Sequence, residues 1–169
     1  SRCAWNTPVA VLMNPRSAEC VKVFFGVWAA GCFYAPLDPM LPPERLKLIM
    51  QNLQPTAIVY DEESRVKAEA VCPDGCGCVL WSDAAQSPVD ADKLVQIRQT
   101  VTPDHLAAIL YTSGSTGIPK GVAHTQGSLM AYTEETIERY QFTENTVFGN
   151  QSPFFYANSI IDIFPPALL

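Results

Sequence analysis

Short apolar runs alternate with helix-forming segments along the first sixty residues, and this alternation limits the possible folds more than any other feature of the chain. The apolar runs have the length of buried strands and span residues 9–13, 32–36 and 56–60. The segments between them favour helices, over residues 17–30 with Ser17 as N-cap and over residues 43–52 with proline in the first turn. Strands that are separated by helices pair in parallel, so we expect an α/β fold with a largely parallel sheet flanked by helices.

The remainder of the chain shows the same alternation with a weaker pattern. We expect further strands at residues 79–81, 106–111, 121–124 and 146–150, and further helices at residues 62–70, 92–99, 125–140 and from Asn158 onward. Thr125 and Asn158 have side chains that suit the N-cap position of a helix. The helix at 17–30 is apolar on most sides and should be buried, and the helix at 125–140 should present one face made of Leu129, Tyr132, Thr136 and Tyr140.

The composition is that of a folded domain. Of the 169 residues, 48% are apolar and 17% are charged, which is enough for one core, and we expect residues 1–169 to contain no internal domain boundary. The formal charge of −6, with no basic patch to offset it, argues against a nucleic-acid partner. No apolar stretch reaches the roughly 18 residues that a membrane span requires, so we expect no membrane span.

The six cysteines form two groups. Cys3, Cys20 and Cys32 are scattered among apolar residues, where a thiol behaves as a small hydrophobe. The other three, in CPDGCGC, are Cys72, Cys76 and Cys78. A tetrahedral zinc site needs four ligands at paired spacings, and no fourth cysteine or histidine lies near, so a surface turn with reduced thiols is favoured over a metal site. Reduced thiols are typical of a cytoplasmic protein.

The segment from Tyr111 to Val122, YTSGSTGIPKGV, is suited to wrapping an anion. Its glycines allow close approach of the backbone, its hydroxyls donate hydrogen bonds and its lysine supplies a positive charge. The segment is a poor helix or strand for the same reasons. A Walker phosphate loop places lysine between glycine and Ser/Thr, whereas Lys120 lies between Pro119 and Gly121, so the P-loop pattern is excluded.

The string TSGSTGIPKG at residues 112–121 instead resembles the signature loop of the adenylate-forming, or AMP-binding, superfamily. Residues 26–53, which contain AGCFYAPLDP and PPERL, are similar to a segment of amino-acid adenylation domains. Residues 148–164 are similar to the core segment of those domains that usually reads Phe-Asp-x-Ser before a helix. The chain most resembles D-alanine–carrier protein ligases and the adenylation domains of non-ribosomal peptide synthetases, from about residue 8 to its end.

This resemblance implies an ATP-dependent ligase that activates a carboxylate, by expectation an amino acid, as an acyl-adenylate with release of pyrophosphate. The acyl group then passes to the thiol of a phosphopantetheinyl carrier protein. By resemblance, Lys120 is the catalytic cation, and the residues that hold the phosphates of ATP are Thr112, Ser113, Gly114, Ser115, Thr116, Gly117 and Lys120. The acid would contact Ala157 and Asn158.

The sequence departs from the family pattern at several positions. The family's aspartate pairs with the α-amino group of the substrate, whereas Ala157 stands at this position, and a buried ammonium without a counter-charge is unfavourable. Asn158 could anchor the substrate, although capping the last helix is the favoured role, and Asp162 should face outward. Gln126 replaces a histidine found in many members, His124 is expected to be a packed or edge residue, and His105 has no supporting motif.

The family's later motifs supply the adenine pocket, a Mg²⁺-binding glutamate, a ribose-binding aspartate and a C-terminal lysine, and none of them is in this sequence. We therefore expect a partial N-terminal domain of a longer enzyme, with the ligands of Mg²⁺ elsewhere, that is inactive by itself. Two alternatives stay open. One is a CoA ligase for a non-amino carboxylic acid, which Ala157 favours, and the other is a non-catalytic nucleotide-binding remnant.

Overall fold

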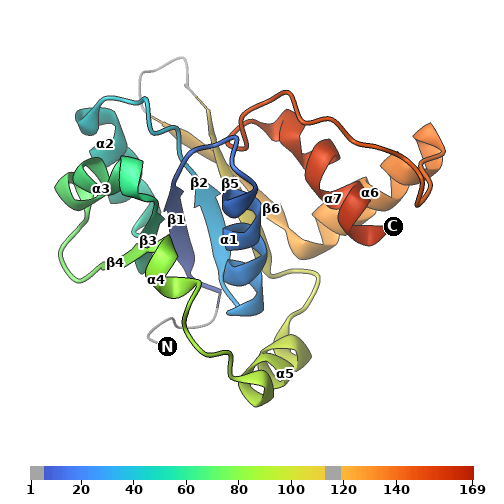
Figure 1. Ribbon diagram of the computed structural model, residues 1–169, viewed down its shortest axis with the longest axis horizontal. Helices are drawn as coiled ribbons and strands as arrows, with labels where there is room; N and C mark the ends of the chain where they lie inside the picture. The colour runs from blue at the N-terminus through green and yellow to red at the C-terminus, as the bar shows by residue number, and fades with distance from the viewer. Residues whose placement is uncertain (1–5, 113–118) are drawn as a thin grey trace.

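The computed structural model describes residues 6–112 and 119–169 and contains a six-stranded sheet in the order β4-β3-β1-β2-β5-β6 (Figure 1). The first four neighbouring pairs are parallel, and only β5 and β6 are antiparallel. The strands are β1 Pro8–Leu12, β2 Phe33–Pro36, β3 Ala57–Tyr60, β4 Gly77–Leu80, β5 Leu106–Thr112 and β6 Lys120–Thr125. The expected α/β fold with a largely parallel sheet is confirmed.

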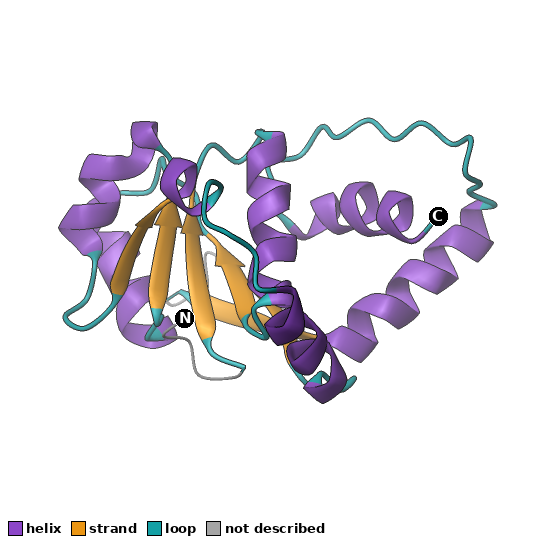
Figure 2. Ribbon diagram, turned by 60° about the horizontal axis from the view of Figure 1, so that its bottom comes forward, coloured by secondary structure: helices purple, strands orange, loops and turns teal. Residues whose placement is uncertain are grey.

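The helices lie on both faces of this sheet and beyond its β6 edge (Figure 2). They are α1 Ala18–Ala29, α2 Pro43–Leu53, α3 Arg65–Val71, α4 Trp81–Ala84, α5 Ala91–Thr100, α6 Gln126–Tyr140 and α7 Ile160–Leu168, with the 3-10 turns η1 Glu62–Ser64 and η2 Ala157–Ser159. Local signals explain the two helices that the sequence defines best. The Ser17 hydroxyl accepts a hydrogen bond from the Glu19 amide at the start of α1, and proline opens α2.

Two hydrophobic cores cover the two faces of the sheet because side chains alternate along each strand. On one face, Val9 and Val11 of β1 pack with α1, α6 and α7. On the other face, Ala10 and Leu12 pack with α2 and α3. The buried residues of α2 are those that helical spacing predicts, namely Leu46, Ile49, Met50 and Leu53.

Two expected strands differ from the structure. Residues 146–150 form no strand, and Val147 in this segment is 95% exposed. A short segment with apolar residues makes a strand only where another strand offers an edge, and this segment pairs with none of the described strands. The strand expected at 79–81 is β4, which begins at Gly77 and ends at Leu80, since Trp81 starts α4.

Two expected helix faces and one cap were also wrong. Helix α1 is covered on one side only, and Phe25 is 37% exposed. In α6 the buried residues are Leu129, Thr133 and Thr136, whereas Tyr132 and Tyr140 are exposed. Asn158 lies inside η2 and does not occupy the N-cap position of α7. That position belongs to Ser159, whose hydroxyl donates to the Tyr156 carbonyl.

A carboxylate on α1 ties this helix to α4. Glu19 accepts hydrogen bonds from Lys22 Nζ at 2.6 Å and from Trp81 Nε1 at 2.7 Å, and these bonds, that of Lys22 first, lower the pKa of Glu19. A lowered pKa in the folded state contributes stability that is present above the ordinary value of 4.5 and is lost as the pH falls through the folded-state pKa.

Glu19→Gln should therefore modestly lower the melting temperature at neutral pH, because it removes the charge that both donors contact. The difference in melting temperature between the variant and the native protein should disappear as the pH is lowered from about 7 to about 3. Thermal unfolding followed by tryptophan fluorescence across this range measures this difference. A difference that stays constant in acid would contradict the assigned role of the carboxylate.

Candidate functional site

The two ends of the predicted phosphate loop are held together by strand pairing. Strands β5 and β6 are antiparallel, Thr112 lies opposite Lys120, and the Thr112 hydroxyl donates to the Lys120 carbonyl at 3.4 Å. The predicted loop residues between them lie outside the described residues and are Ser113, Gly114, Ser115, Thr116 and Gly117. The loop therefore starts and ends at the carboxyl end of β5, where strands of α/β sheets carry their ligand sites.

Lys120 is exposed at the first position of β6. It forms no ion pair with any residue in the described ranges 6–112 and 119–169, and the residues outside these ranges include no carboxylate side chain. The positive charge of Lys120 is therefore not neutralised by the chain itself. A cation beside a hydroxyl-rich and glycine-rich segment suits an anion such as a phosphate.

Lys120 and His124 lie on the same face of β6. Their partners in β5 are Thr112 and Ala108, and Ala108 belongs to the core that contains α1, α6 and α7. Side chains four positions apart on a strand point to the same side and are separated by about 13 Å. The loop lysine and the histidine are thus two points along one side of the edge strand.

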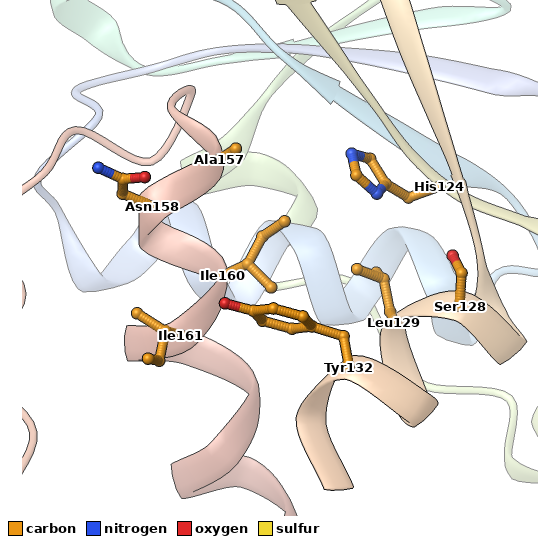
Figure 3. A pocket seen from close by; sticks show the side chains of 8 residues that line it. All are labelled: His124, Ser128, Leu129, Tyr132, Ala157, Asn158, Ile160 and Ile161. Carbon is orange, nitrogen blue, oxygen red and sulfur yellow. The ribbon is translucent and has the colours of Figure 1, made fainter. Parts of the chain in front are cut away.

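An open pocket of about 550 Å³ lies on this face, between β6, α6 and α7 (Figure 3). The residues that line it are His124 from β6, Ser128, Leu129 and Tyr132 from α6, and Ala157, Asn158, Ile160 and Ile161 from η2 and α7. Figure 3 shows the Tyr132 ring between the two helices and the Asn158 amide turned away from His124. The volume of this pocket is within the range of small-molecule binding sites.

Contacts with α1 hold η2 and α7 in place beside the pocket. The Phe154 amide donates to the Pro15 carbonyl at 2.9 Å, just before α1 begins. Phe164 of α7 stacks on Trp28 of α1, with ring centroids 5.2 Å apart. The wall of the pocket that carries Ala157 is therefore fixed to the core of the sheet and not only to α6.

His124 is half-buried, and burial lowers its pKa. The imidazole is therefore neutral near pH 7. The prediction of an edge histidine is confirmed, since β6 is the last strand of the sheet, but the residue also lines the pocket. Gln126 is the first residue of α6, and His105 accepts a hydrogen bond from the Thr102 amide at 3.3 Å, a local contact within its turn.

The sequence prediction missed most of the pocket. Of its eight lining residues, only Ala157 and Asn158 were expected there. Even spacing along a strand could have placed His124 on the side of Lys120, but the residues of α6 become lining residues only where α7 packs against that helix. Asp162, which was expected to face outward, is half-buried and accepts a hydrogen bond from Asn150 Nδ2 at 3.0 Å.

Gly121 has a packing role at the exit of the loop. A Cβ atom on this residue would lie 2.6 Å from Ile109 Cγ2 and 3.4 Å from the Tyr111 ring. The Tyr111 hydroxyl in turn donates to Asn52 Oδ1 at 2.7 Å, which ties β5 to α2. The glycine therefore lets β6 lie close against β5 at the base of the loop.

The cysteine turn is separate from this site. Cys72 and Cys78 are free thiols, and burial together with a hydrogen bond to Cys72 raises the pKa of Cys78 to about 12. In the described ranges, no group of three His, Cys, Asp or Glu side chains is arranged to hold a metal ion. None of the helices in the described part of the chain combines the length and apolar character needed to cross a bilayer.

A mostly parallel sheet with an anion-suited loop at the end of one strand, and a pocket beside it, defines an α/β ligand-binding domain. The chain belongs to the AMP-binding enzyme family, whose model matches residues 6–169. It is 33% identical over 163 residues to L-proline–[L-prolyl-carrier protein] ligase of Pseudomonas fluorescens, covering 91% of this chain and 32% of that protein. It is 31% identical over 153 residues to D-alanine–D-alanyl carrier protein ligase of Bacillus anthracis, covering 87% of this chain and 28% of that protein.

Solved structures share the fold. ATP-bound MatB from Rhodopseudomonas palustris aligns over 97% of this chain and 33% of its own, with a TM-score of 0.82 and 22% identity. McyG A-PCP in complex with phenylalanyl-adenylate aligns over 99% of this chain and 28% of its own, with a TM-score of 0.83 and 21% identity. The chain thus spans about a third of the length of the relatives that it matches.

Proposed function

We propose that the full-length protein containing this chain is an AMP-forming acid–thiol ligase, and that residues 1–169 are part of its N-terminal domain. The observation that carries this proposal is the placement of Lys120, at the end of the loop, on the side of β6 that also bears the pocket. A ligase of this kind must hold a carboxylate beside the phosphates of ATP. One face of β6 offers a position for both, with Lys120 beside the phosphates and the pocket for the acid.

The residues present fit these two tasks. The loop hydroxyls and backbone amides would hold the β- and γ-phosphates, and Lys120 would neutralise charge on the departing pyrophosphate. These phosphate-binding residues are Thr112, Ser113, Gly114, Ser115, Thr116, Gly117 and Lys120. Ala157 and Asn158 would contact the acid. ATP supplies the activated phosphorus that the carboxylate attacks, and Mg²⁺ is expected to accompany it.

The acceptor is proposed to be the thiol of a phosphopantetheinyl carrier protein, because both relatives reported above are named as carrier-protein ligases. CoA is the second candidate acceptor, and it is favoured by the uncharged pocket, which suits a non-amino acid. A cytoplasmic location is supported by the free thiols of Cys20, Cys72 and Cys78.

The test is acid-dependent exchange of labelled pyrophosphate into ATP by the full-length protein, with a panel of amino acids and simple carboxylic acids. We expect at least one acid to raise the exchange rate well above the rate without acid. Binding of ATP without exchange for any acid would support the non-catalytic remnant instead. The separately purified 1–169 segment should show no exchange.

A further inference from the structure

Among the described residues, those that line the pocket beside β6 include no charged side chain. Five of its lining residues are apolar or aromatic, and the other three are the neutral groups of His124, Ser128 and Asn158. The imidazole of His124 is kept neutral by burial near pH 7. A group that enters this pocket therefore meets apolar walls and hydrogen-bonding groups, but no carboxylate.

The carboxylates of the surrounding elements are directed elsewhere. Four occur on α6 and α7, and none lines the pocket: Glu134, Glu135, Glu138 and Asp162. Glu135 is paired with Arg139 at 2.5 Å, and Asp162 accepts from Asn150. The residues outside the described ranges are SRCAW and SGSTGI, which include no acidic side chain.

The nearest charge on the same side of β6 is positive. Lys120 lies about 13 Å from His124 along the strand, toward the phosphate loop. A carboxylic acid would therefore point its carboxylate toward Lys120 and place the rest of the molecule among Leu129, Tyr132 and Ile160. An ammonium group there would exchange part of its hydration for apolar walls without gaining a counter-charge, which is unfavourable.

We propose that this pocket selects a carboxylic acid whose acyl group is uncharged and largely apolar, and that it discriminates against the corresponding α-amino acid. This inference rests on the proposed function and adds the substrate class. It differs from the amino acids in the names of the two relatives. A volume of about 550 Å³ has room for an aromatic or branched acyl group.

Matched acids test the proposal in the full-length protein. The pairs are 3-phenylpropanoate with L-phenylalanine, and cyclopentanecarboxylate with L-proline, so that each pair differs mainly by the ammonium. The neutral member should support faster pyrophosphate exchange by at least about tenfold at subsaturating acid. A preference for the amino member would overturn the proposal while leaving the ligase function intact. If none of the acids supported pyrophosphate exchange, the proposed function would be overturned, and this inference with it.

A charge introduced into the pocket provides a second test. Ala157 is exposed to the pocket, so Ala157→Asp should fold and should shift the ratio of the two rates toward the amino member by at least about tenfold. Ala131→Asp is the matched control, because it adds the same charge on an exposed position of α6 that does not line the pocket. An equal shift in both variants, or none in Ala157→Asp, would contradict the assigned position of the acyl group.

Discussion

Lys120→Ala should lower the rate of acid-dependent pyrophosphate exchange by the full-length protein by about 100-fold or more. Lys120 lies at the point where the loop joins β6, and no carboxylate of the described chain neutralises it. Removing it would leave the charge that develops on pyrophosphate without the positive charge of the loop lysine. Because the side chain is exposed and has no core contact, the melting temperature should stay nearly unchanged.

Two further variants sharpen this experiment. Lys120→Arg keeps the charge and should retain more exchange than Lys120→Ala, although its planar head group fits a lysine site imperfectly. Lys47→Ala removes an exposed lysine from α2 and should leave the exchange rate near that of the native protein. An unchanged exchange rate in Lys120→Ala would show that this lysine does not act at the phosphate site. An equal loss of exchange rate in Lys47→Ala would indicate a general effect of charge.

Phe24→Ala should destabilise the fold by about 3–5 kcal/mol. Phe24 is 1% exposed at the centre of the core between α1 and the sheet. Its ring stacks on Tyr34 of β2, with centroids 4.0 Å apart and an angle of 6° between the planes, and it meets the edge of Phe154 at 6.3 Å. Truncation would leave a cavity where α1, β2 and the segment before η2 meet.

The urea midpoint and melting temperature of the full-length protein measure this loss. Leu48→Ala is the matched control, because Leu48 is 47% exposed on α2 and its truncation should cost about 0.5 kcal/mol or less. The stability of Phe24→Leu should lie between those of Phe24→Ala and Leu48→Ala. Equal stability of Phe24→Ala and Leu48→Ala would show that this aromatic cluster does not support the fold.

The loss of Phe24 should also reach the pocket. Phe154 precedes η2, and its position depends on the Phe24 ring and on the hydrogen bond to the Pro15 carbonyl. We therefore expect the apparent KM for the acid to rise in Phe24→Ala at temperatures where the protein is still folded. The pocket is thus coupled to the core on which its α7 wall rests.

Local signals in the sequence determined the elements that need no distant partner to be recognised. Ser17 caps α1, Pro43 opens α2, and the spacing of Leu46, Ile49 and Met50 identifies the buried side of α2, since caps and helical periodicity act within a few residues. The chemistry of the loop was also legible, because the position of Lys120 between proline and glycine distinguishes it from a Walker loop.

Tertiary structure alone decided which segments meet. Residues 146–150 form no strand because no neighbouring strand offers them an edge, and Tyr132 lines a pocket instead of a core because α7 packs beside α6. The pairing of β5 with β6 decided which side of the sheet bears Lys120 and His124. Strand pairing, register and the surfaces that face each other depend on residues far apart in the chain, and local patterns do not reveal them. The sequence by itself therefore predicted the phosphate loop and the presence of a largely parallel sheet. Only the fold brought the uncharged pocket to the side of the loop lysine.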